Sequence, residues 1–227
     1  MVFVQSITGF GSNVVMMAIL PSFLPTFTSS AVADFSGFLT ALLLGWKYFR
    51  KANFRILIVP LCFFLAVSAL CVFLSISAPD DLLRRGLGII LLLLSLYFFF
   101  FQQKARLRPT FLSGMAMGIL SGITGGLFAM AGPPFVLYAL SCIEDHEEYM
   151  GTIEFYFIIV SSFTFLLRLF GGAFSAELMM MNAVTLCALA LALPLGTKVV
   201  KKLNPTVIRR LVYLFMAVTG LWMCVQP

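Results

Sequence analysis

Eight long apolar stretches divide the sequence, and they limit its possible folds more than any other feature. An α-helix needs roughly 20 apolar residues to cross the hydrocarbon layer of a bilayer, and each stretch is near that length or longer. Backbone polar groups inside lipid must be paired within the protein, which a helix achieves on its own. The stretches end at charged or Pro/Gly-rich breaks and lie at about 2–27, 29–49, 56–77, 82–101, 110–143, 152–170, 178–197 and 207–225. They predict an all-α polytopic membrane protein.

The composition indicates that lipid covers much of the surface. Of the 227 residues, 61% are hydrophobic and 11% are charged. An ordinary soluble domain has roughly 25% charged residues, and a soluble fold of this size could not bury so much apolar surface. The chain has room for one membrane domain and for no sizeable soluble domain. Membrane lipid is therefore an expected partner.

The net charge of +6 does not indicate nucleic-acid binding, because the basic residues lie in short loops between apolar stretches. That placement is typical of the positive-inside rule. The five cysteines are dispersed without a CxxC motif. The single histidine, His146, lies in an acidic loop that is better explained as a solvated loop than as a divalent-cation site. We expect no nucleic-acid partner, no metal and no cofactor.

The two halves of the chain resemble each other. Ser6–Gly11 parallels Gly122–Gly126, with Ile-Thr-Gly repeated after 116 positions. Pro79 followed by a paired arginine parallels Pro205 followed by another, and each pair opens the last segment of its half. The matches occur in the same order, which favours an internal duplication. The predicted repeats are about 1–105 and 106–227.

The distribution of Lys and Arg selects a topology. With eight single crossings, the loops on each side would carry seven basic residues. If the stretch 110–143 enters the membrane and returns to the same side, twelve basic residues face the cytoplasm, and Arg84 and Arg85 face outward. The second arrangement follows the positive-inside rule. We therefore predict inverted repeats, each opening with a Gly/Pro-broken or re-entrant helix.

The glycines and prolines within 6–25 and 121–134 indicate broken helices at membrane depth. Irregular backbone survives there only against protein or a wet cavity, and a free half-helix N-terminus attracts anions. Transporters use such breaks, in corresponding positions of two repeats, to bind solute. An alternative is that the glycines only allow close helix packing. The candidate solute-binding residues are Ser6, Thr8, Gly9, Gly11, Ser12, Asn13, Ser121, Gly122, Thr124, Gly125, Gly126, Gly132, Pro133 and Pro134.

Three ionisable residues lie inside apolar stretches, where a charge is expensive and becomes a functional hypothesis. Arg168 is a candidate for contact with the solute, and Asp34 and Glu154 are candidate proton carriers. Asp34 could instead act near a helix cap, and Arg168 could extend toward the membrane surface. Glu154 and Arg168 are 14 residues apart and cannot pair, since this spacing is about 21 Å along a helix.

At these motifs the sequence resembles the sulfite exporter TauE/SafE family, also called the toluene sulfonate uptake permease group. The resemblance rests on Ser6–Ser12 with Pro21 and, more clearly, on Ser121–Pro134, and it extends over essentially the whole chain. The family has a Gly-rich stretch ending in Pro once per half. Ala129 and Ala131 stand where glycine is often found. The resemblance implies that the solute is sulfite, a sulfonate or another small anion, and that the protein lies in a bacterial inner membrane.

The predicted function is secondary transport of a small anion, with the two repeats alternating access to a site between the broken elements. Nucleotide-binding motifs and the HExxH and GxSxG motifs are absent from the sequence, so we do not expect an enzyme. An accessory or structural membrane subunit is the main alternative, followed by an intramembrane enzyme. A homodimer is compatible with the sequence.

Overall fold

The computed structural model describes residues 12–46, 48–101, 110–173, 175–176, 178–187 and 205–225, and these residues are helical or in short turns. The main helices are α2 (Ser12–Ile19), α3 (Thr26–Gly45), α4 (Phe54–Ser77), α5 (Asp80–Phe101), α6 (Phe111–Phe128), α7 (Gly132–Cys142), α8 (His146–Arg168) and α10 (Pro205–Val225). Shorter helical pieces are η1 (Leu20–Ser22), η2 (Phe49–Lys51), η3 (Leu169–Ala173, a π-turn) and Leu178–Cys187. The described residues contain no strand, which confirms the all-α prediction.

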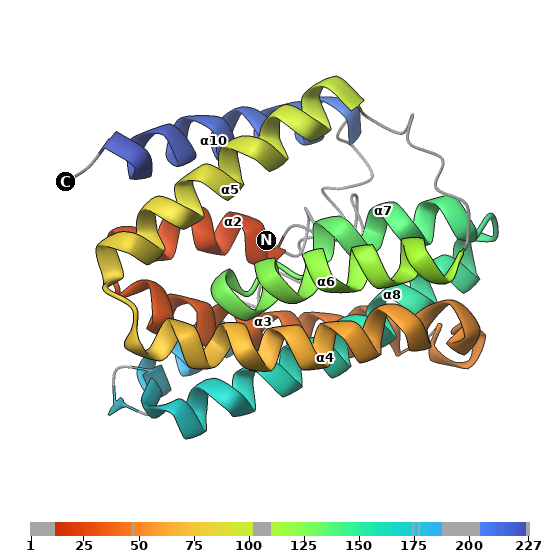
Figure 1. Cartoon of the computed structure of the whole chain (residues 1–227), viewed down its shortest axis with the longest axis horizontal. Helices are drawn as coiled ribbons and strands as arrows, with labels where there is room; N and C mark the ends of the chain where they lie inside the picture. Colours follow the sequence, from red (N-terminus) through yellow and green to blue (C-terminus); the bar gives the residue numbers. More distant parts are fainter. Residues whose placement is uncertain are drawn as a thin grey trace.

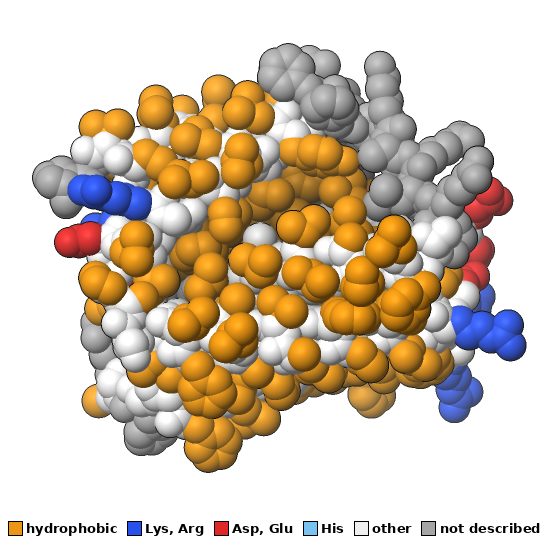
Figure 2. All heavy atoms as spheres, viewed as in Figure 1, with side chains coloured by type: hydrophobic (Ala, Val, Ile, Leu, Met, Phe, Trp, Pro, Cys, Tyr) orange, Lys and Arg blue, Asp and Glu red, His pale blue; other side chains and the backbone are white. Residues whose placement is uncertain are grey.

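The helices have the lengths and surfaces of membrane spans. In the described part of the chain, α3, α4, α5, α6 and α8 with its η3 extension are long and apolar enough to cross a bilayer. Large apolar side chains such as Phe99 and Phe170 are exposed on the outside. Figure 2 shows apolar side chains over the middle of one face and charged side chains at its two ends. This pattern matches a protein surrounded by lipid.

Polar caps fix the ends of the helices at one end of the bundle. The Asn53 side chain accepts hydrogen bonds from the first backbone N–H groups of α4, and Asp145 accepts from Glu148 N at 2.8 Å to start α8. Asn53 Nδ2 also donates to Glu148 Oε1 at 2.6 Å, and Lys51 pairs with Glu147. The Glu147 carboxylate raises the pKa of Lys51 above its ordinary value. These contacts join the start of α4 to the start of α8.

The predicted stretch 110–143 is a hairpin of two helices. α6 runs from right to left in Figure 1, and α7 starts near the middle and returns toward the right. The two helices are in contact and are separated by Ala129–Ala131. The described part of the first stretch is also interrupted, because α2 ends in η1 and Pro25 precedes α3. Segments 110–143 and 2–27 are therefore both broken, as the Gly and Pro positions predict.

The helices of the two halves run in opposite directions. In Figure 1 α2 starts near the middle of the bundle and runs to the left, and α3 runs back to the right. α7 also starts near the middle but runs to the right, and α8 runs back to the left. α5 and α10 pack against each other with opposite directions, and Ser95 Oγ of α5 donates to Tyr213 O of α10 at 2.7 Å. These directions are those that the inverted topology predicts. The duplication of 1–105 in 106–227 stays a prediction.

A stripe of glycines on α6 allows close packing against α4. A Cβ at Gly118 would lie 2.5 Å from Pro60 O, and one at Gly126 would lie 2.8 Å from Ser68 O. A Cβ at Gly122 would lie 2.9 Å from Val67 Cβ. Glycines four residues apart share one helix face and let two backbones approach closely. Close packing therefore accounts for Gly122 and Gly126, as the alternative interpretation of the motif proposed.

We expect the C-terminus to face away from the cytoplasm. α4 and α10 both begin at the right-hand end in Figure 1, so their basic flanks share one face and the C-terminus lies at the opposite end. An alkaline phosphatase fused after Pro227 should be active in intact bacteria, whereas a fluorescent protein that folds only in the cytoplasm should stay dark. The reverse pattern would exclude the inverted topology.

Candidate functional site

A pocket lies where the breaks of the two halves meet inside the bundle. Its empty volume is about 430 Å³. It is lined by residues of α2, α3, the α6–α7 break and α8: Ser12, Asn13, Val14, Asp34, Gly37, Gly125, Ala129, Met130, Ala131, Gly132, Pro133, Phe157, Val160, Ser161 and Thr164. In Figure 1, α2 and α7 both begin near the middle of the long axis, which places the pocket well away from either end.

The start of α7 and the first described residues of α2 face this pocket. Gly132 and Pro133 form the start of α7, and Ser12, Asn13 and Val14 are the first residues of α2 that the structure describes. The first N–H groups of a helix have no intrahelical acceptor and carry the positive end of the helix dipole. Pro133 and Pro134 lack N–H groups, so the start of α7 offers few backbone donors. Among the described residues that line the pocket there is no Lys or Arg.

The end of α6 holds a strained backbone position. Ala129 has φ 55°, in the left-handed region, and its N–H bonds Gly125 O at 2.9 Å. This conformation ends α6 and turns the chain toward α7. Glycine adopts it without the steric penalty of a Cβ, so Ala129 is strained at a position that would suit glycine.

The two breaks are hydrogen-bonded to each other. Asn13 Nδ2 donates to Ala129 O at 3.0 Å, and these residues are separated by 116 positions. The Ile-Thr-Gly motif repeats after the same number of positions. Residues that the predicted duplication would make equivalent therefore meet beside the pocket.

Ser121 fixes the start of α7 against α6 and α8. Its hydroxyl donates to Ala131 O and lies 2.7 Å from the Tyr156 hydroxyl. The Tyr156 ring stacks on Phe135 of α7, with ring centroids 3.7 Å apart. Ser121 and Tyr156 are both fully buried. Together they stabilise the hairpin turn behind the pocket.

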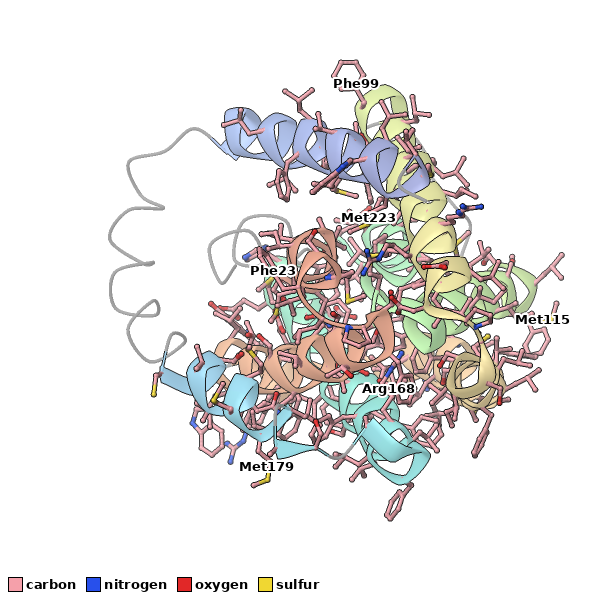
Figure 3. All side chains as sticks on the ribbon, turned by 90° about the vertical axis from the view of Figure 1, so that its left-hand side faces the viewer. Phe23, Phe99, Met115, Arg168, Met179 and Met223 are labelled. Carbon is pink, nitrogen blue, oxygen red and sulfur yellow. The ribbon has the colours of Figure 1, made fainter. Side chains whose placement is uncertain are left out.

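A fully buried ion pair lies beside the pocket. Arg168 Nη1 is 2.5 Å from Asp34 Oδ2, and neither residue exceeds 2% exposure. Arg168 Nη2 also donates to Gly126 O at 2.6 Å and to Gly125 O at 3.3 Å. In Figure 3 Arg168 lies inside the bundle, while Phe99 and Met179 point outward. A charge at this depth is tolerated only when it is paired and hydrogen-bonded.

Arg168 changes the electrostatics of the pocket indirectly. The last carbonyls of α6 carry the negative end of its dipole. The Arg168 guanidinium neutralises both that end and the Asp34 carboxylate. Arg168 is outside the pocket lining, whereas Asp34 is part of it. The positive end of the α7 dipole then remains beside the pocket.

The structure divides the predicted site residues into three groups. Those that line the pocket are Ser12, Asn13, Gly125, Gly132 and Pro133, together with Asp34. Those that lie outside the described residues are Ser6, Thr8, Gly9 and Gly11. Those that lie elsewhere in the fold are Ser121, Gly122, Thr124, Gly126, Pro134, Arg168 and Glu154.

Several residues of the third group have other contacts. The Thr124 hydroxyl donates to Leu120 O at 3.0 Å within α6, and Pro134 is buried in the first turn of α7. Glu154 is fully buried on α8 beside Gly45, where an added Cβ would lie 2.7 Å from Glu154 Cβ. The structure therefore separates the two candidate proton carriers, since Asp34 reaches the pocket and Glu154 does not.

The motif-based prediction did not include the wall that α8 contributes. Phe157, Val160, Ser161 and Thr164 line the pocket at spacings of three and four residues. The same helical face continues to Arg168, one turn after Thr164. A periodicity search from Arg168 toward the N-terminus of α8 would have found this face.

Interrupted helices from two halves that meet at a pocket inside an apolar bundle define an α-helical membrane protein of the transporter class. The family model described as sulfite exporter TauE/SafE matches residues 1–223, and the chain belongs to this family. Searches of curated proteins and of solved structures return no match.

Removing the buried cation should strongly destabilise the protein. Arg168→Met leaves Asp34 buried and unpaired, and we expect a loss of about 3–5 kcal/mol in the free energy of unfolding. Arg84→Gln is the control, because Arg84 is partly exposed and lies 3.5 Å from Asp80, so its loss should change stability by about 1 kcal/mol or less. Thermal unfolding in detergent measures both. Equal effects would mean that the Arg168–Asp34 pair does not hold the bundle together.

Relieving the strain at the end of α6 should stabilise the fold. Ala129→Gly removes the Cβ from a left-handed residue, and the gain should be up to about 1 kcal/mol after the greater freedom of glycine in the unfolded chain is included. Ala131→Gly is the matched control, because Ala131 has φ −66° and should only lose stability. A rise in unfolding temperature for both variants, or for neither, would contradict the assignment of strain to Ala129.

Proposed function

We propose that the chain is a secondary transporter that moves a small anion, in chemical terms a sulfur oxyanion or organosulfonate such as sulfite, through this pocket. The observation that carries the proposal is the pocket inside the bundle, where the first described residues of α2 meet the α6–α7 break and the N-terminus of α7. Helix N-termini bind oxyanions through backbone N–H groups. The family name, sulfite exporter, supports the sulfur-containing class of solute.

The pocket lining suits an anion that has to be released again. Ser12, Asn13 and Ser161 offer hydroxyl and amide groups. Among the lining residues that the structure describes there is no Lys or Arg. Partial charges and hydrogen bonds hold an oxyanion more weakly than a direct ion pair would, which favours release on the far side of the membrane.

Part of the pocket lining is apolar. Phe157, Val160 and Met130 belong to this part. They would exclude water from the solute where they touch it, which strengthens its hydrogen bonds to the polar groups. A sulfur centre that carries oxygens together with a lone pair or a small organic group matches a lining of both kinds.

The inverted directions of the helices support alternating access as the mechanism. α2–α3 and α7–α8 begin in the middle and run to opposite ends (Figure 1), so rocking one set against the other would open the pocket first to one face and then to the other. The Asn13–Ala129 hydrogen bond lies between the two sets and would be a point about which they move.

Filling the pocket should stop transport. Ser161→Leu places a larger apolar side chain in the lining, and substrate flux should fall by roughly tenfold or more, equivalent to about 1.4 kcal/mol of lost binding. Ser162→Leu is the control, because Ser162 is outside the lining and its hydroxyl bonds Ile158 O at 2.6 Å. Uptake and efflux of sulfite, sulfonates, sulfate and small carboxylates should be measured in proteoliposomes. Unchanged flux in Ser161→Leu would place the solute path elsewhere, and absence of flux for every anion would favour an accessory role.

A further inference from the structure

We infer that Asp34 carries a proton that moves together with each anion, so that transport is electroneutral. Arg168 stays in place and balances the charge of Asp34 when the site is empty. The inference rests on the proposed function and adds its coupling ion. It starts from the charge balance of the pocket. Among the described residues that line the pocket, Asp34 is the only one with an ionisable side chain, and Arg168 behind it carries the opposite charge.

The geometry gives Asp34 two neighbours with different roles. One carboxylate oxygen, Oδ2, receives Arg168 Nη1 at 2.5 Å, and the residue also borders the pocket. A proton arriving through the pocket therefore reaches the carboxylate without displacing Arg168. Arg168 remains held by the carbonyls of Gly125 and Gly126 when Asp34 becomes neutral.

Charged groups on the elements packed around α3 do not alter this balance. On α8, Arg168 faces Asp34, while Glu154 lies beside Gly45 near the other end of α3. On α5, Asp80 accepts from Thr26 N at 2.6 Å at the start of α3 and pairs with Arg84. The remaining neighbours of α3, namely α2, α6, η1 and η3, contain no Asp, Glu, Lys, Arg or His.

The electrostatic consequence is a coupling between anion and proton. The empty site is neutral because Asp34 and Arg168 cancel. An anion adds one negative charge in a region of low dielectric, where an unbalanced charge is costly. Protonation of Asp34 restores neutrality, so anion binding favours proton binding and the reverse must also hold.

The balance of charge through one cycle follows directly. One proton from the side of entry binds the Asp34 carboxylate, and one monoanion binds the pocket. Both leave on the other side, and the Asp34–Arg168 pair is re-formed as the empty, neutral state. No net charge crosses the membrane, and the cycle needs no further reactant.

The test uses the full chain in proteoliposomes with methanesulfonate as the probe, because this sulfonate stays a monoanion over the pH range used. An inward methanesulfonate gradient should acidify the lumen by one proton per anion, as reported by a trapped pH dye and radiolabelled probe. A potential imposed with valinomycin should not change the rate. Net methanesulfonate uptake without lumen acidification would overturn the inference while leaving the proposed function intact. Absence of exchange for every anion tested, sulfite and small carboxylates included, would overturn both.

Asp34→Asn should separate exchange from net transport. Its empty site carries the unbalanced charge of Arg168, so anion-for-anion exchange should continue, whereas proton uptake should fall to the level of liposomes without protein. Glu154→Gln is the matched control: it also replaces a buried carboxyl, and it should acidify the lumen as the wild type does. Proton uptake that persists in Asp34→Asn, or that disappears only in Glu154→Gln, would refute the assignment to Asp34.

A double variant covers the case in which Asp34→Asn does not fold. Asp34→Asn combined with Arg168→Gln removes both charges and leaves no unpaired ion in the bundle. Its empty site is neutral, so methanesulfonate should cross without a proton, and an imposed potential should now change the rate. A double variant that still acidifies the lumen would overturn the inference. The wild-type proton-to-anion ratio decides the question even without either variant.

Discussion

The buried guanidinium of Arg168 is the interaction on which the architecture of the pocket depends. It joins α8 to Asp34 of α3 and to the Gly125 and Gly126 carbonyls at the end of α6. Arg168 and the end of α6 stabilise each other, because the last carbonyls of a helix lack intrahelical donors and a buried cation needs hydrogen-bond acceptors. α6 can therefore stop inside the protein, and its end is stabilised there. Without that stop, α7 would have no free N-terminus to present to the pocket.

The glycine-rich part of α6 serves two purposes on two faces. Gly118, Gly122 and Gly126 face α4 and let the helices approach, while Gly125 on the adjacent face lines the pocket. Close packing and a solute site are alternative explanations of the motif: close packing applies to Gly118, Gly122 and Gly126, whereas Gly125 lines the pocket that we propose as the solute site. Close contact with α4 also gives the end of α6 the rigid support that a strained Ala129 requires.

The sequence was sufficient for the features that depend on local pattern. Apolar length identified the spans, and Gly and Pro placed the interruption within 110–143, where the structure ends α6 and starts α7. The Asp34–Arg168 pair could not be predicted in this way, because its members are 134 positions apart and no periodicity connects them. Ser121 shows a related limit: a hydroxyl near a break can bind solute or brace the backbone, and the sequence does not show that Tyr156 lies beside it. Helical spacing alone would have added Ser161 and Thr164.

The location of Arg168 behind Asp34 has a consequence for a site that must both bind and release. A cation in direct contact with the anion would form a charge-assisted pair in a low dielectric, and such a pair dissociates slowly. In this protein the full charges of Asp34 and Arg168 cancel one another, and under the proposed function the pocket would hold an anion through its polar side chains and the weaker field of the α7 N-terminus. The bilayer favours the same arrangement, because an unpaired Arg at this depth would also destabilise the protein when no anion is bound. One arrangement thus satisfies both the stability of the bundle and the reversibility of binding, which explains why a carrier of anions would keep its strongest cation outside the lining of its pocket.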